Sequence, residues 1–452
     1  MLKKEICTAL FTKAIYIFCG ALFLMFDGFV NGFPIVYSDT STYIASGFEV
    51  ETPFDRPITY GLFIRAFSLN GLSLWFVVFF QSLLLSYLIF LLIKQVAEES
   101  YLKYGLITII ILSVFTGVSW TASQLMPDIF TSIALIAAIL ILLGKFKKRE
   151  LIFLYTIFFF SIAMHISHLI FFALFLIILF ALRKYFFLGS FYSRVKQKIT
   201  IMFFLVIISI IAMSSAISKS KHVFLMGAMV EHGIAQSFLN DNCGSAEYKL
   251  CAYKDSLPDK AYKFIWDEKS PFYKIGGWEG TKEEFNKIIF KTLTTPKYIR
   301  IHIAESCKAT IQQLILFGIG DGNGSFLSGT RLYERVEKYI PSDLHFYSVS
   351  NQNKEQFGFI KYFNMFYSAI IIMSSMLLIF FSVKYKSYFI PNIYFIIIAI
   401  CTGVLLNAWS CGTFANAVDR LGCKMIWLIP FLAIITAIKI FDSNRNLVRK
   451  KK

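Results

Sequence analysis

The sequence predicts an all-α polytopic membrane protein with about ten transmembrane helices and one mainly helical extracytoplasmic loop domain. Hydrophobic residues fill 57% of the 452 positions and charged residues only 16%, and the mean hydropathy is +0.63. Soluble domains are less apolar and carry more charge. The apolar residues also gather in long runs, as they do in helices that cross a bilayer.

The first apolar run covers residues 12–35 and follows Lys3 and Lys4. Basic residues before an apolar run are typical of a signal peptide, but no small-x-small cleavage site follows this one. We therefore predict that the run is an uncleaved first transmembrane helix.

Nine further runs complete the predicted set, at residues 72–94, 104–119, 128–144, 151–164, 169–182, 199–217, 359–383, 388–408 and 424–441. The two runs between Leu151 and Leu182 are short, and "HISH" (His165 to His168) separates them. One long tilted helix and two short helices that meet at a turn both fit this pattern. We favour two helices, because every basic cluster then falls on the same side of the membrane.

The basic residues predict the orientation. A formal charge of +17 raises the alternative of nucleic-acid binding, but Lys and Arg collect in short segments between apolar runs. This distribution is what the positive-inside rule describes. We therefore predict that both termini are cytoplasmic and that nucleic acid is not a partner.

This orientation predicts three parts of the chain. Residues 1–217 form an N-terminal transmembrane module with catalytic outer loops, and residues 218–358 form an extracytoplasmic soluble loop domain. Helical patterning occurs in that domain at "TKEEFNKIIFKTL" and at "YIRIHIAESCKATIQQLILF". Residues 359–452 form C-terminal transmembrane helices and a basic cytoplasmic tail.

Four cysteines lie in the predicted outer loops. Cys243 and Cys251 lie in the large loop, and Cys411 and Cys423 lie in the last one. Two local pairs on an oxidising face predict two disulfides.

Two carboxylates occur at the predicted outer surface of the membrane. Asp39 follows the first run in "YSDTSTYIASG", and Asp128 opens a later run in "SQLMPDIF". In the structural interpretation, Asp39 caps a helix that begins near Thr40, and Asp128 complements a helix dipole. In the functional interpretation, Asp39 and Asp128 are each a general base or a metal ligand. The position of ionisable groups at membrane depth favours this interpretation.

Histidines and arginines are candidate binding groups. His165 and His168 share a face on a helix and, with two carboxylates, are the residue types that bind a divalent metal. Alternatively, they hydrogen-bond a substrate phosphate or satisfy a helix break. Arg56 and Arg65 are candidates for bidentate phosphate binding, against simple interfacial snorkelling. The predicted substrate-binding set is Tyr37, Tyr43, Arg56, Arg65, His165, His168 and Arg420.

The segment "GIGDGNGSFLSG" (Gly318 to Gly329) has some features of a calcium-binding loop. It lacks the glycine and the terminal glutamate of such loops, because Phe326 and Leu332 occupy those positions. We interpret it as a flexible turn after a helix.

These features resemble the GT-C superfamily of membrane glycosyltransferases. "YSDTSTYI" is similar to the acidic motif of the first outer loop, "RPITYGLFIRAF" to the amphipathic segment after it, and "SQLMPDIF" to the second acidic position. The resemblance covers residues 1–220 in layout. The chain departs from the family in that Asp39 stands alone where many members have an acidic pair. Residues 218–358 match no known acceptor domain.

The resemblance implies an enzyme that moves a sugar from a polyprenyl-phosphate-linked donor to an envelope glycan, lipid or protein acceptor. Asp39 would be the general base, and Asp128 would assist it or hold a metal. The arginines or histidines would neutralise the leaving phosphate. No cofactor is certain, and a divalent metal is the open alternative. "YKLCAYKDSLP" and "SPFYKIGGWEG" resemble segments of uncharacterised bacterial membrane proteins, which favours the bacterial inner (cytoplasmic) membrane.

Three other classes of protein fit the same layout. One is a non-catalytic assembly or receptor protein whose outer loop binds a partner. Polysaccharide polymerases and ligases also have about ten spans and a large outer loop, but they depend on Arg and His of outer loops. A transporter or flippase of lipid-linked intermediates would show inverted repeats and broken helices at the midplane. Neither feature is clear in this sequence.

Overall fold

Helices form all the regular elements of the computed structural model, which describes residues 2–186, 189–245, 248–389 and 391–451. Over these residues, six helical segments are long and apolar enough to cross a membrane: Trp75–Lys94, Ile166–Phe186, Ser193–Ala212, Ile360–Lys384, Pro391–Phe414 and Asp419–Ser443. The protein is therefore an all-helical, multi-pass membrane protein, since helices satisfy every backbone polar group within the bilayer.

The predicted count of ten crossing helices is not established by helix length. Each predicted run forms a helix, but the apolar helices Leu10–Leu24, Tyr101–Phe115 and Ile129–Leu143 are shorter than the six. A helix of 15 residues is about 22 Å long, which is less than the roughly 30 Å of a hydrocarbon core. The apolar character of Ile129–Leu143 is explained by packing inside the protein, because every residue of this helix is buried.

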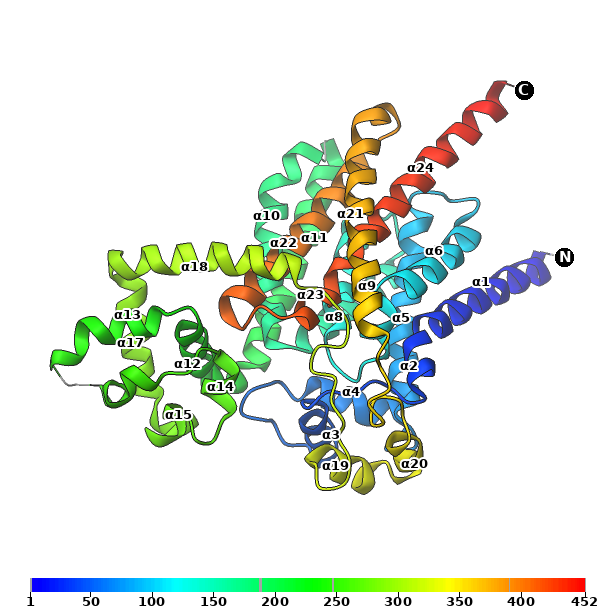
Figure 1. Cartoon of the computed structure of the whole chain (residues 1–452). Helices are drawn as coiled ribbons and strands as arrows, with labels where there is room; N and C mark the ends of the chain where they lie inside the picture. The colour runs from blue at the N-terminus through cyan, green and yellow to red at the C-terminus, as the bar shows by residue number, and fades with distance from the viewer. Residues whose placement is uncertain (1, 187–188, 246–247, 390, 452) are drawn as a thin grey trace.

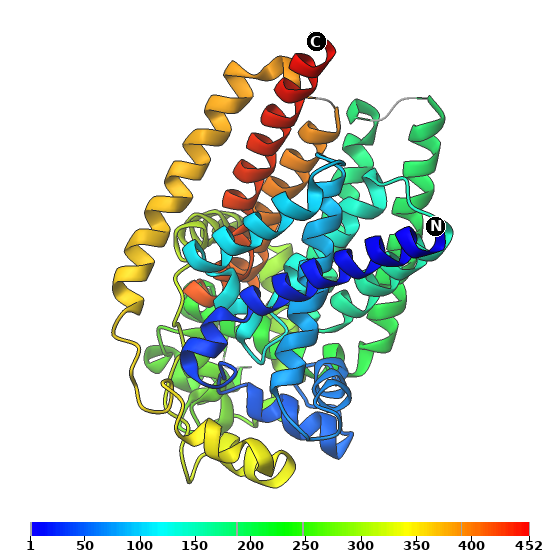
Figure 2. The same cartoon turned by 90° about the vertical axis from the view of Figure 1, so that its right-hand side faces the viewer.

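This buried helix, α8, lies within a bundle of helices (Figure 1). Its members are α1 (Leu2–Leu24), α5 (Trp75–Lys94), α6 (Tyr101–Phe115), α9 (Lys148–Ala163), α10 (Ile166–Phe186), α11 (Gly189–Ala212), α21 (Ile360–Lys384), α22 (Pro391–Phe414), α23 (Asp419–Ile426) and α24 (Leu428–Lys451). At the edge of the bundle, α21 and α24 run side by side in both views (Figure 2).

The "HISH" segment separates two helices, as we predicted. α9 ends at Ala163 and α10 begins at Ile166, and the two helices pack against each other. His165 therefore lies at the turn between them.

Short helices lie at the lower end of the bundle in Figure 1. They are α2 (Phe26–Asn31), α3 (Thr40–Glu49) and α4 (Thr59–Phe67), and α7 (Val118–Ser123) packs on α2. α3 and α4 approach closely because each helix has a glycine where they cross, Gly47 in α3 and Gly61 in α4. A Cβ on Gly47 would lie 2.0 Å from the Gly61 carbonyl oxygen. A longer side chain at either position would separate the helices.

The predicted loop domain at 218–358 is divided between two apolar cores. Its first part forms a separate lobe with its own core, drawn to the left in Figure 1. The lobe contains α12 (Ser214–Glu231), α13 (Ile234–Asn242), η1 (Cys243–Ser245), η2 (Lys249–Ser256), α14 (Ala261–Trp266), α15 (Pro271–Lys274), α16 (Gly277–Gly280), α17 (Lys282–Thr294) and α18 (Pro296–Ile315).

The second part returns to the main bundle through α19 (Arg331–Tyr339), η3 (Pro341–Asp343) and α20 (Leu344–Ser348). Leu332 and Val336 of α19 belong to the main core, and α19 packs on α3. The buried Asp343 carboxylate accepts hydrogen bonds from the backbone N–H of Leu74 at 2.7 Å and from the Ser73 hydroxyl at 2.9 Å. These bonds attach the segment to the start of α5. η4 (Lys386–Tyr388) then joins α21 to α22.

Of the two predicted disulfides, the structure contains Cys243–Cys251, in the lobe. The prediction of a Cys411–Cys423 bond is wrong: within the described residues both are free, buried thiols. The reason is that both cysteines lie inside helices, α22 and α23, rather than in the short loop between them. The Cys423 thiol lies 3.6 Å from the Thr121 hydroxyl.

Candidate functional site

Two segments far apart in the sequence are joined just before Asp39 and Asp128. Ile35 and Gln124 form an isolated parallel β-bridge: the Ile35 amide donates to Ser123, and the Leu125 amide donates to Ile35, both at 2.9 Å. This backbone pairing sets the starts of α3 and α8 beside each other. The two carboxylates therefore belong to one site.

Asp39 occupies the N-cap position of α3, but its carboxylate forms no capping hydrogen bond in the described structure. It accepts instead from Arg56 Nη2 at 3.2 Å. Arg56 also pairs with the neighbouring Asp55. The Asp39 side chain keeps 32% of its surface exposed, whereas that of Arg56 keeps 9%. The structural interpretation is thus correct for the backbone position of Asp39 and incorrect for its side chain.

Asp128 shows the same relationship at the start of α8. It lies at the N-cap position, and within the described residues its side chain makes no capping bond. Its carboxylate accepts from Arg420 Nη1 at 3.2 Å and lies 3.7 Å from Lys424 Nζ. Asp128 and Lys424 are both buried, with 8% and 3% of their side chains exposed. Arg420 keeps 16% of its side chain exposed. Three charges from the start of α8 and from α23 therefore meet with little exposure to water.

Two tyrosine rings lie beneath the arginines. The Arg56 guanidinium is 4.9 Å from the centre of the Tyr43 ring, and the Arg420 guanidinium is 4.2 Å from the centre of the Tyr37 ring. Cation–π contact of this kind fixes the plane of each guanidinium. Burial raises the pKa of both tyrosine hydroxyls, so both stay neutral at physiological pH.

The two histidines have different roles. His168 is buried, and both ring nitrogens are used: Nε2 bonds the Thr131 hydroxyl at 2.8 Å, and Nδ1 bonds the Ser161 carbonyl at 2.8 Å. His168 therefore connects α10 to α8 and α9, and the predicted contact with substrate is not supported.

His165 lies at the turn beside the site. Its Nδ1 accepts the Ser167 backbone N–H at 3.2 Å, which assigns the proton to Nε2. Burial first, and then the positive charges of Lys424, Arg56 and Arg420, lower the pKa of His165 to about 3. His165 is therefore a neutral hydrogen-bond donor at the edge of the charged cluster.

One predicted binding residue lies elsewhere. Arg65 is at the C-terminal end of α4, where its Nε donates to Asn70 at 3.0 Å and its guanidinium lies 5.9 Å from the centre of the Phe48 ring. α4 places it on a solvent-facing groove with Leu62 and Leu69. Arg65 thus lies apart from the cluster of Asp39 and Asp128, and its binding of phosphate stays a prediction.

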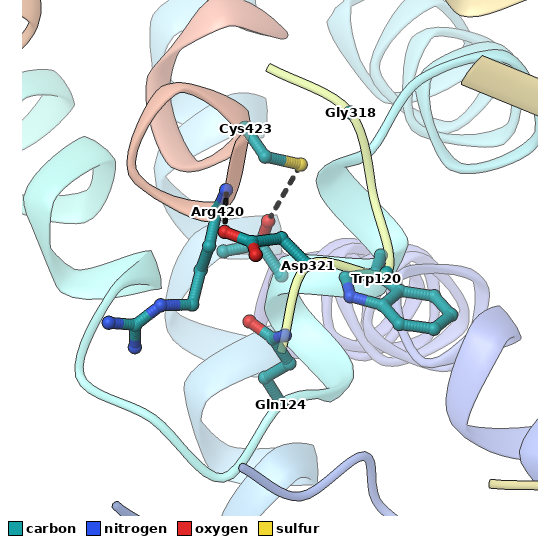
Figure 3. A pocket seen from close by; sticks show the side chains of 8 residues that line it. Trp120, Gln124, Gly318, Asp321, Arg420 and Cys423 are labelled. Carbon is teal, nitrogen blue, oxygen red and sulfur yellow. Dashed lines mark hydrogen bonds between the residues drawn. The ribbon is translucent and has the colours of Figure 1, made fainter. Parts of the chain in front are cut away.

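Sequence reasoning missed Lys424 and Asp321. The backbone N–H of Arg420 donates to Asp321 at 3.2 Å, and Figure 3 shows the Arg420 side chain extending away from that contact. Asp321 belongs to the glycine-rich segment that we interpreted as a flexible turn. Gly322, at φ +67°, packs so closely that a Cβ would lie 1.7 Å from the Tyr37 ring. The many glycines around Asp321 were the sequence feature that could have indicated this close packing.

A divalent metal, which the sequence left as an open alternative, does not fit the arrangement. Among the described residues, no group of three His, Cys, Asp or Glu side chains could hold a metal ion. Asp39 and Asp128 face cations, and both nitrogens of His168 are occupied. The donor set required for Zn²⁺ or Mg²⁺ is therefore not assembled here.

The arginines retain capacity to bind a further anion. Arg56 Nη1 and Arg420 Nε are buried and have no acceptor within the described part of the chain. An unpaired buried N–H is costly, so oxygen atoms of a ligand would stabilise the site. No family model, curated protein or solved structure matches this chain. Function is accordingly argued from the site itself.

Proposed function

We propose that the protein is a membrane glycosyltransferase that moves a sugar from a polyprenyl-phosphate-linked donor to an envelope glycan, lipid or protein acceptor. The single observation that carries this proposal is the pairing of Asp39 and Asp128 with Arg56 and Arg420 in one cluster. The cluster combines a carboxylate that solvent reaches with two guanidinium groups that retain unpaired N–H donors. A glycosyl transfer needs a base for the acceptor and cations for the leaving phosphate.

In this proposal Asp39 is the catalytic base. It removes the proton from an acceptor hydroxyl, whose oxygen forms a bond to the anomeric carbon of the donor sugar. The bond between that carbon and the phosphate oxygen breaks, and the lipid phosphate leaves with the electron pair. Asp39 suits this role because its side chain is 32% exposed, whereas that of Asp128 is 8% exposed.

Arg56 and Arg420 would bind the phosphate. Arg56 already pairs with Asp39 and Asp55, and Arg420 pairs with Asp128. Each guanidinium also lies on a tyrosine ring, so its orientation is fixed before the donor arrives. Preorganised cations stabilise developing negative charge with little reorganisation. Asp128 then acts as a positioning residue, because it holds Arg420 and Lys424 in place.

The proposal places this site at the outer face of a bacterial inner membrane. The Cys243–Cys251 disulfide in the lobe supports an oxidising compartment for that side. The basic ends of the chain support a cytoplasmic location for both termini. A lipid-linked donor would present its sugar at this depth while its tail stays in the bilayer.

The test is complementation of a gene deletion with wild type, Asp39→Asn or the control Glu49→Gln, at equal expression. Glu49 is a matched control because it ends the same helix, α3, and pairs with Arg335 at 2.6 Å. We expect wild type and Glu49→Gln to restore an envelope glycan or lipid one sugar heavier, by intact mass, and Asp39→Asn to fail. Restoration by Asp39→Asn would refute the assignment, and a change in chain length alone would favour a polymerase.

A further inference from the structure

Helix α18 runs across the axis of the bundle. Figure 1 shows it extending from the bundle into the lobe, crosswise to α10, α11 and α21. Its inner face packs on the end of α22: the Ser306 and Thr413 hydroxyls are 2.8 Å apart, and a Cβ on Gly412 would lie 2.7 Å from the Ala309 carbonyl oxygen. Because α22 is a candidate span, its end marks a face of the membrane. α18 therefore crosses the end of a candidate membrane-spanning helix.

The outer face of α18 is apolar and exposed. Ile303, Ile311 and Ile315 keep 60%, 64% and 70% of their surface accessible, and Cys307 is exposed between the first two. Their spacing of four residues places them on one side of the helix. Three isoleucines exposed to this degree on one helix face form a contiguous patch of the kind that marks an interaction surface.

The same face carries positive charge. Arg300 and Lys308 are exposed, and each lies three residues before an exposed isoleucine, Ile303 and Ile311 respectively. The nearby Glu305 is only 27% exposed and bonds Lys308 at 3.3 Å. Basic side chains beside an apolar stripe, on a helix that lies along a membrane, are the pattern of an interfacial helix.

We propose that α18 lies in the lipid headgroup region at the membrane face where α22 ends, with the Ile303–Ile315 face toward the acyl chains and Arg300 and Lys308 on anionic headgroups. The lipid is favoured over a protein partner because this face continues from the end of a membrane-crossing helix. The consequence for the site is direct: Gln313 of α18 holds Val418 through two hydrogen bonds, of 2.9 and 3.0 Å, just before Arg420. The inference does not depend on the proposed function.

The native Cys307 allows a test in the full-length protein. Cys7, Cys19 and Cys401 are replaced by serine, Cys307 is labelled with an environment-sensitive fluorophore, and the protein is placed in nanodiscs of phosphatidylcholine with or without phosphatidylglycerol. Quenching is measured with nitroxide-bearing lipid and with aqueous iodide. The control carries Cys307→Ser and a label at Lys269→Cys. Lys269 is exposed and precedes α15, which lies on the side of the lobe away from α18 (Figure 1).

We expect lipid nitroxide to quench the Cys307 label severalfold more than the Lys269→Cys label, and iodide to show the opposite order. Equal quenching of both labels by iodide would place the face in water and overturn the proposal. Protection of the Cys307 label from both quenchers would mean that protein covers the face, which also overturns it. Arg300→Gln with Lys308→Gln should weaken lipid quenching only in discs with phosphatidylglycerol; no such difference would refute the role of anionic lipid.

Discussion

Arg420 Nη1 donates to the Asp128 carboxylate at 3.2 Å and thereby joins the start of α23 to the start of α8. The two residues are 292 positions apart in the sequence. Lys424, one turn further along α23, shares the same carboxylate. A single buried anion thus fixes two cations beside the proposed phosphate site.

Asp128→Asn should lower stability strongly, because it leaves Arg420 and Lys424 buried without their counter-ion. Removing one partner of a buried pair costs about 3–5 kcal/mol. Thermal unfolding in detergent is the measurement, with Asp259→Asn as control, since Asp259 is 71% exposed and pairs with Lys263. We expect the control to melt with wild type, because exposed pairs contribute little. An unchanged melting temperature in Asp128→Asn would contradict the buried pairing.

A double-mutant cycle separates the pair from its surroundings. Asp128→Asn and Arg420→Gln should be less destabilising together than the sum of the two single changes, because the second change removes the charge that the first leaves unpaired. The same melting measurement reports the coupling. Additive effects would show that the two side chains do not interact in the folded protein.

Asp39→Asn should have the opposite balance of effects. Its side chain is partly exposed, so its loss should change the melting temperature little. Its proposed role as base predicts loss of the sugar-bearing product in the complementation assay. A stable but inactive Asp39→Asn variant would assign Asp39 a chemical role, in contrast to the positioning role of Asp128. An unfolded Asp39→Asn would instead assign the residue to structure.

The sequence predicted the helical elements well because apolar runs report directly on burial. It also predicted the break at His165, where the charge pattern required a turn. Asp39 and Asp128 could be selected because each follows or opens an apolar run. Their partners could not be assigned, since the bridge between Ile35 and Gln124 is a contact between distant segments with no local signal.

The division of residues 218–358 between two cores was equally hidden. The composition of residues 218–358 predicts that the segment lies outside the membrane. It does not predict which apolar core each helix joins, because that depends on packing between distant residues. Val336 of α19 belongs to the main core, and Phe285 of α17 belongs to the lobe, although both helices have amphipathic patterns. Lys424 was missed because a lysine in an apolar run usually reaches the interface. Here it is buried against Asp128.

His165 should make stability depend on pH. Its pKa is about 3 in the folded protein against 6.5 ordinarily, so between these values only the unfolded chain binds the proton. The free energy of unfolding therefore falls as pH decreases below about 6.5, and is unaffected by this group at higher pH. His165→Asn should lose less melting temperature than wild type between pH 7 and pH 5. The exposed His345→Asn should follow wild type; identical profiles for all three would contradict the lowered pKa of His165.

Gly322 provides the last prediction, because it lies against the ring that supports Arg420. A Cβ at this position would lie 1.7 Å from the Tyr37 ring, and the backbone at φ +67° already disfavours any other residue. Gly322→Ala should therefore push Tyr37 from beneath the Arg420 guanidinium, which lies 4.2 Å from the ring centre. We expect lower stability, by about 1–3 kcal/mol, and loss of product in the complementation assay.

Gly324→Ala is the matched control for this change. It lies two residues along the same segment, and its added Cβ would only reach ordinary contact with Phe326, at 3.7 Å. Because both variants add one methyl group to the same glycine-rich segment, a general loss of flexibility would affect them equally. Impairment of Gly322→Ala alone would show that this position excludes a Cβ, through its backbone φ of +67° and its contact with the Tyr37 ring. Equal impairment of both variants would favour the interpretation of the segment as a flexible turn, which its composition predicts.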